Sequence, residues 1–235
     1  MRFVDEVALV VIAKAPAPGR SKTRLCPPCT PEQAAALAEA SLRDTIEAVA
    51  VAPARRRIVA LEGQPDGWLR PGFELHRQRG NGLAERLGDA LVAAGGPALV
   101  VGMDTPQLSA PLLQEAARRL CAPGIDAVLG PAVDGGYWTI GLRRPDHSVF
   151  SGVPMSRADT FAAQRIRLGA LGLRTALLAP LRDVDTIEDA AAVARASPNT
   201  EFAAALRLLA PALPTAIPGV EPLAWEGCSP SRPRP

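Results

Sequence analysis

Two hydrophobic patterns alternate along the chain. Unbroken apolar runs, such as residues 7–13 and 98–101, have the length and composition of strands that are buried on both faces. Between these runs, apolar residues recur every three or four positions, which is the pattern of a helix with one buried side. Strands that alternate with helices predict an α/β fold, in which a mostly parallel sheet is covered by helices.

The same patterns give approximate bounds for each element. The first helix is expected to start after Thr30, because Thr30 and Gln33 have the spacing of a capping box and Pro31 suits the first helical position. Its buried face continues to Val49. Further helices are expected at residues 83–94, 109–120, 158–171, 186–196 and 201–209. Strands are expected at residues 7–13, 57–61, 73–77, 98–101, 127–130 and 137–142.

Length and charge limit the classes of protein that fit. The 235 residues are enough for one domain, which we place at residues 1–210, followed by a proline-rich tail at residues 211–235 without a fold of its own. The net charge of +2 gives no reason to expect a nucleic acid or a membrane as partner. No apolar segment has the length of a membrane span, and the N-terminus lacks the layout of a secretory signal. We therefore expect a cytoplasmic protein.

One loop concentrates positive charge. The chain has only two lysines, Lys14 and Lys22, and both lie in residues 14–25, here called the basic loop, together with Arg20 and Arg24. The loop contains no acid and follows the first buried strand, where α/β folds bind the phosphates of nucleotides. It is not a Walker loop, since Ser21 stands where that motif needs glycine, so phosphate would be held by side-chain cations. The competing interpretation is an ordinary solvated basic loop.

Two aspartates lie next to other predicted elements. Asp104 comes just after the strand at residues 98–101, where a carboxylate facing the basic loop could hold Mg²⁺ or Mn²⁺ on phosphates. It could equally be a turn aspartate before Thr105 and Pro106. Asp185 is a second candidate ligand, although Asp185 or Thr186 would make a good N-cap for the helix that follows, and the pattern alone favours the cap.

Two glycine-containing segments are candidate contacts for a ligand. In the first, Asp134 precedes two glycines and Tyr137, a pattern typical either of a hairpin turn or of backbone that approaches a ligand closely. In the second, Gly82 opens a helix and could let a nucleotide base lie against the backbone, or could be only a helix start. Cys26 and Cys29 have the spacing of a redox or zinc element, but without a second ligand pair we expect two cysteines in a turn, with an adventitious disulfide as the alternative.

Taken in order, these segments resemble the bacterial family DUF2064 of the GT-A-like nucleotide-diphospho-sugar transferase superfamily. Members of this family are often labelled as glycosyltransferases, including ones named for arsenosugar biosynthesis, and phospholactate guanylyltransferases are more distantly similar. The matching segments lie between residues 7 and 196: KxPxPGRxKTRL at 14–25, GLxER at 82–86, GxDxP at 102–106, GPxxDGGYWxIGL at 130–142 and DVDT at 183–186.

The resemblance implies a GT-A-like three-layer α/β/α fold, a bound nucleotide or nucleotide sugar, and a divalent metal, Mg²⁺ or Mn²⁺. It implies that the cations of the basic loop hold the phosphates, with Lys22 also acting in catalysis. Asp104 would be the metal-binding aspartate and Asp185 the second ligand. Gly82 and Tyr137 would contact the nucleotide ligand, and Asp134 would act on the acceptor. One departure matters: Gly102 stands two residues before Asp104, where an Asp-x-Asp motif would place another acid.

The main functional hypothesis is therefore a metal-assisted glycosyltransferase that uses a nucleotide-diphosphate sugar and a small-molecule acceptor. The first alternative is a nucleotidyltransferase, in which a phosphorylated substrate attacks an NTP and pyrophosphate leaves. The second is a nucleotide-binding domain without turnover.

Overall fold

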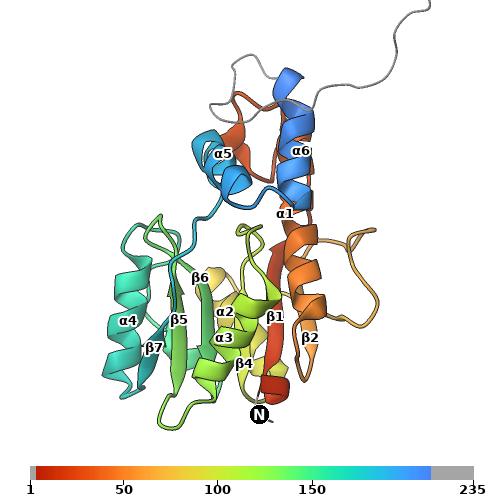
Figure 1. Cartoon of the computed structure of the whole chain (residues 1–235). Helices are drawn as coiled ribbons and strands as arrows, with labels where there is room; N and C mark the ends of the chain where they lie inside the picture. Colours follow the sequence, from red (N-terminus) through yellow and green to blue (C-terminus); the bar gives the residue numbers. More distant parts are fainter. Residues whose placement is uncertain (1–3, 213–235) are drawn as a thin grey trace, which may run out of the picture.

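The computed structural model describes residues 4–212, which form one seven-stranded sheet between two layers of helices (Figure 1). This confirms the predicted α/β class and the mostly parallel sheet. Of the predicted proline-rich tail, residues 213–235 lie outside the described part. No helix in residues 4–212 is long and apolar enough to cross a membrane.

The strands lie in the order β3-β2-β1-β4-β6-β5-β7. All neighbouring strands are parallel except β6, which runs antiparallel to both β4 and β5. Their bounds are β1 Ala8–Lys14, β2 Arg57–Glu62, β3 Glu74–Arg77, β4 Ala98–Val101, β5 Ala127–Pro131, β6 Tyr137–Leu142 and β7 Thr175–Leu177. The sequence pattern missed β7, because three half-exposed residues at the edge of a sheet carry no readable period.

Two helices cover each face of the sheet. On one face α1 and α3 bury residues such as Leu42 and Leu113 against β1 and β4, and on the other face α2 and α4 bury residues such as Leu91 and Leu168. The helices are α1 Pro31–Val51, α2 Leu83–Ala94, α3 Ala110–Leu120, α4 Thr160–Ala170, α5 Ile187–Ala196 and α6 Glu201–Leu209. The predicted capping box of Thr30 and Gln33 opens α1 with both of its hydrogen bonds present.

A smaller third core joins α5 and α6 to the first half of α1 (Figure 1). Its residues include Leu25 of the basic loop, Val184, and the fully buried Phe202 of α6. Leu25 is next to Arg24 of the basic loop, and Val184 is next to Asp185. This core therefore connects the basic loop to the chain segment before α5.

The direction of chain progression changes between β1 and β4. From β1 the chain proceeds outward to β2 and β3, then returns to place β4 on the other side of β1. Ligands of open α/β sheets bind at such a switch point, beyond the carboxyl ends of the strands. The basic loop leaves β1 there and Asp104 follows β4 there, so the topology itself brings these two predicted segments together.

Candidate functional site

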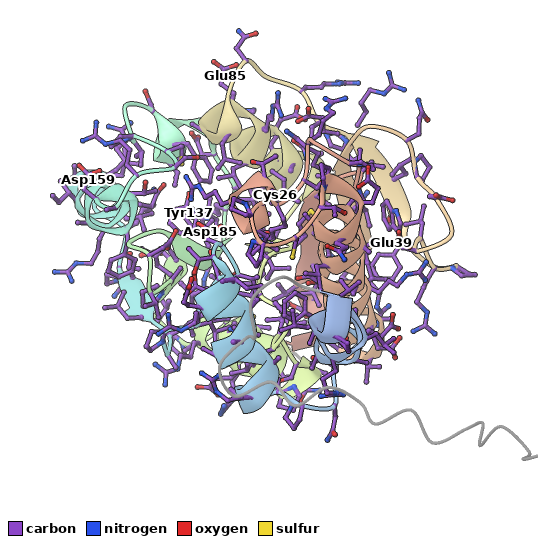
Figure 2. The ribbon with its side chains drawn as sticks, turned by 90° about the horizontal axis from the view of Figure 1, so that it is seen from above. Cys26, Glu39, Glu85, Tyr137, Asp159 and Asp185 are labelled. Carbon is purple, nitrogen blue, oxygen red and sulfur yellow. The ribbon has the colours of Figure 1, made fainter. Side chains whose placement is uncertain are left out.

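A cavity of about 650 Å³ opens at this switch point. Its walls come from the ends of β1 and β4, the turn between β5 and β6, the segment before α4, and residues 183 and 185. A second hollow of about 310 Å³ lies beside it around the basic loop, and Lys14, Arg24, Asp104 and Asp185 line both. Viewed from above, Tyr137 and Asp185 lie near the middle of the molecule, whereas Asp159 and Glu85 lie at its periphery (Figure 2).

Lys22 is the buried cation of the site. Its side chain is only 7% exposed, and its Nζ lies 2.6 Å from Oδ1 of Asp104 and donates a hydrogen bond to the carbonyl of Val184. The backbone of Lys22 has φ 49°, a left-handed conformation that costs energy for a residue with a side chain. Arg24, two residues later, places Nη1 2.8 Å from Oδ2 of Asp185.

The other two cations of the basic loop meet a glutamate that the sequence did not single out. Glu62, at the end of β2, lies 3.6 Å from Lys14 and 3.9 Å from Arg20, and it also pairs with Arg86 of α2. Partial burial acts to raise the pKa of Glu62, but the hydrogen bond from Arg86 and the charge of Lys14 outweigh it, so the pKa is lowered. Glu62 is therefore ionised at neutral pH and holds three cations near the cavity.

The segment before α5 delivers acids to the cavity. The backbone N–H of Val184 donates to the carbonyl of Asp104 over 2.9 Å, which fixes this segment against the end of β4. Asp183 and Asp185 on either side of Val184 both line the cavity. The sequence analysis selected Asp185 and missed Asp183, although the two-residue spacing of an extended segment was a signal that both would face the same side.

Asp183 is the more unusual of the two acids. Its Oδ1 is buried without a hydrogen-bond partner among the described residues. Burial, followed by the nearby charges of Asp104 and Asp134, raises the pKa of Asp183 to about 7, against a smaller opposing influence of Lys22. Four aspartates thus line the cavity, Asp104, Asp134, Asp183 and Asp185, in addition to Glu62.

These acids fit a divalent cation that completes its shell with ligands from a substrate. Within residues 4–212 no three His, Cys, Asp or Glu side chains are grouped to hold a metal ion. Mg²⁺ is nevertheless commonly bound by one or two carboxylates together with substrate phosphates and water. The unpartnered oxygen of Asp183, next to two further carboxylates, is the kind of acceptor that such a cation would satisfy.

The Asp134 segment forms a tight turn that another loop packs against. The Oδ1 of Asp134 accepts a 2.8 Å hydrogen bond from Gly136 N–H. Gly135 has φ +91°, and a Cβ there would lie 2.0 Å from the carbonyl oxygen of Ala158. The glycine therefore allows residues 155–158 to close one wall of the cavity.

Tyr137 and Gly82 differ in their relation to the cavity. Tyr137 lines it, its hydroxyl lies 3.4 Å from Oε1 of Gln164, and burial raises the pKa of the phenol. Gly82 is the N-cap of α2 in extended conformation, and the cavity is lined instead by Leu83 and Arg86 of that helix. Cys26 and Cys29 form no disulfide, and burial, with the neighbouring Cys26, raises the pKa of Cys29.

Comparison with known proteins agrees with this geometry. A crystal structure of a candidate nucleotide-diphospho-sugar transferase from Desulfovibrio desulfuricans G20 shares 28% identity and superposes with a TM-score of 0.78, covering 86% of this chain and 94% of that one. A cytidylyltransferase from Leptospira borgpetersenii matches at 13% identity and a TM-score of 0.51, covering 87% of this chain and 93% of that one. That likeness is one of fold alone. No curated protein matches the chain.

The family comparison covers residues 36–157, just over half of the chain. This range contains Gly82, Asp104 and Asp134, but it does not contain the basic loop, Asp183 or Asp185. For those residues, the assignment to the site comes from the structure and not from the family match. The chain belongs to the family DUF2064, described as an uncharacterized protein conserved in bacteria.

Proposed function

We propose that this chain is a transferase that binds a nucleotide-diphosphate sugar in the 650 Å³ cavity and moves its glycosyl group to a small acceptor. The observation that carries the proposal is the meeting of the basic loop with Asp104, Asp183 and Asp185 at the switch point of the sheet. Such a pairing of cations and carboxylates suits a diphosphate with its metal. The relative from Desulfovibrio desulfuricans, which is described as a candidate for this activity, supports the same assignment.

In this proposal the diphosphate is held by the basic loop. Arg20 and Arg24 offer forked guanidinium groups, and Lys14 and Lys22 offer compact charges. Asp104, with Asp183 and Asp185, would hold Mg²⁺ or Mn²⁺, which supplies neutralisation of the diphosphate charge. The loop cations stabilise the negative charge that develops on the departing diphosphate, which is the largest charge change of the reaction.

Asp134 is the proposed general base. It lines the cavity, and the hydrogen bond from Gly136 N–H fixes the orientation of its carboxylate. An acceptor hydroxyl that lies against Asp134 would transfer its proton to the carboxylate while its oxygen bonds to the sugar carbon. The residue arises from the same tight turn as Tyr137, whose ring forms the adjacent wall.

One observation favours nucleotidyl transfer as a second candidate. Arg157 lies in the wall formed by residues 155–158, on a different segment from the basic loop. Its side chain is 65% exposed and pairs with Asp159. A cation there suits an acceptor that is itself phosphorylated, whose phosphate would attack the α-phosphate of an NTP and release pyrophosphate.

The test is a thermal-shift screen of nucleotides and nucleotide sugars, with and without Mg²⁺, followed by product analysis. A ligand that binds only the folded protein raises its unfolding temperature. With the stabilising donor and a panel of acceptors, we expect a nucleoside diphosphate and a glycosylated product, both lost in the Asp104→Asn variant. Pyrophosphate release from an NTP would overturn glycosyl transfer in favour of the second candidate. Nucleotide binding that is indifferent to Mg²⁺, without turnover, would overturn both.

A further inference from the structure

Two of the carboxylates that suit a metal, those of Asp104 and Asp185, each form an ion pair with a cation of the basic loop. Lys22 lies 2.6 Å from Asp104, and Arg24 lies 2.8 Å from Asp185. Both basic residues come from a single stretch of the loop, and Lys22 is almost completely buried in its pair. The loop is thus docked on the acids by two ion pairs.

The same two cations are among the four that the proposed function assigns to the nucleotide phosphates. The ammonium of Lys22 cannot lie against Asp104 and the carbonyl of Val184 and also neutralise a phosphate elsewhere in the cavity. Its backbone, at φ 49°, lies in the left-handed region, which is disfavoured for a residue with a side chain.

We propose that Lys22 and Arg24 are resident counter-ions of the cation site, which one divalent cation replaces when it arrives together with a nucleotide. The exchange conserves charge, because one ion of charge +2 takes the place of one lysine and one arginine at the carboxylates. The released side chains then contact the phosphates. The inference rests on the proposed function and adds that the metal and the nucleotide bind cooperatively, because both depend on the release of Lys22 and Arg24.

Neither the divalent cation alone nor the nucleotide alone is expected to bind well at this site. A free divalent ion would approach Asp104 and Asp185 against the charges of Lys22 and Arg24. A nucleotide alone would draw those cations away and leave Asp104, Asp183 and Asp185 without compensation, in a site where Asp183 Oδ1 is already unpartnered. Each ligand therefore raises the affinity for the other, by the same factor in both directions.

The first test measures Mn²⁺ binding by calorimetry without any nucleotide. We expect Lys22→Met to bind Mn²⁺ about tenfold more tightly than the wild type, within the usual range for coupled sites. Arg43→Met is the control, because it removes one positive charge from an ion pair, with Glu39 of α1, that lies outside both hollows. Its Mn²⁺ affinity should match that of the wild type. Equal Mn²⁺ affinity in Lys22→Met and the wild type would overturn the exchange.

The second test needs no substitution. Since the chain has only two lysines, a protein with ¹⁵N-labelled lysine gives two side-chain ammonium signals. Mg²⁺ alone should leave the Lys22 signal in place, and Mg²⁺ with UDP or GDP should move it. A Lys22 signal that stays fixed while the nucleotide binds would overturn the proposal. Tighter Mn²⁺ binding by Lys22→Met, with no binding of any nucleotide by the wild type, would instead support the counter-ion role and reject the proposed transferase.

Discussion

At the scale of single residues, the site is distinguished by a buried carboxylate with one unpartnered oxygen. Asp183 has a buried oxygen without a partner and lies among three other acids. Such a group costs free energy in the unliganded protein and persists where binding a ligand requires it. Asp104 differs, since it compensates the buried ammonium of Lys22.

This difference predicts opposite effects on stability for two similar substitutions. Asp183→Asn removes a repelled buried charge and should raise the free energy of unfolding by about 1 kcal/mol. Asp104→Asn leaves Lys22 without its carboxylate and should lower it by about 1–3 kcal/mol. Both variants should lose Mg²⁺-dependent nucleotide binding. Denaturant unfolding and a thermal-shift titration measure the two properties, and a destabilised Asp183→Asn protein would show that Asp183 has a structural partner.

At the scale of elements, one turn positions the cavity wall formed by residues 155–158. Phe161 N–H donates to the carbonyl of Gly135 over 2.9 Å, and Ala158 packs where a side chain at 135 would be. The Asp-Gly-Gly sequence thus serves the docking of the segment before α4.

Gly135→Ala should therefore displace residues 155–158 and impair turnover. Gly172→Ala is the matched control, because Gly172 also has positive φ, at +71°, but a Cβ there meets nothing within 4 Å. We expect the control to lose about 1 kcal/mol of stability from backbone strain alone. Gly135→Ala should lose at least twice that and show a raised KM for the acceptor. Equal losses in both variants, with normal KM, would contradict a role for the turn in placing this wall.

The helix α5 has a pH-sensitive start. Asp189 accepts hydrogen bonds from Thr186 and from Arg182. Burial acts to raise the pKa of Asp189, but these donors outweigh it and lower the pKa. A depressed folded-state pKa means that the unfolded chain binds the proton more readily, so this stabilisation is present above the unfolded value of about 3.9 and is lost as pH falls through the folded value.

Asp189→Asn should accordingly be less stable than the wild type by about 1 kcal/mol at neutral pH, the scale of a helix cap. The difference should vanish once the pH lies below the folded pKa of Asp189, where both side chains are neutral. Urea unfolding of the two proteins across this range measures it. A difference that stays constant with pH would assign the effect to lost geometry instead of lost charge.

The elements were largely predictable because their signals are local. The long apolar runs at residues 7–13 and 98–101 became β1 and β4, and the capping box at Thr30 opened α1. The same local pattern placed Asp104 beyond a strand end and the basic loop beyond another. It could not identify Glu62 or Arg157, because their place beside the cavity depends on where distant segments meet. The spacing of Asp183 and Asp185 pointed to one shared side, but the burial of Asp183 among other acids again depends on distant segments.

At the scale of the whole molecule, the third core connects both halves of the site. Phe202 is fully buried there with Leu25, which ends the basic loop, and with Val184, which lies between the two acids. The ion pairs of Lys22 and Arg24 span the same two segments. Stability of this core and affinity for the ligand should therefore change together.

Phe202→Ala tests this link against a matched loss of stability elsewhere. Removing the ring should cost about 3–5 kcal/mol, and Leu120→Ala, at the end of α3 in the core between α1 and α3, should cost about 2–5 kcal/mol. Both proteins are compared at a temperature at which each remains folded. We expect only Phe202→Ala to weaken binding of the Mg²⁺–nucleotide complex. Only the space left by the missing ring of Phe202 loosens the packing of both Leu25 and Val184. Equal affinity of the two variants for the Mg²⁺–nucleotide complex would contradict this link. It would mean that the ion pairs alone hold the basic loop against the acids, without support from α5 and α6.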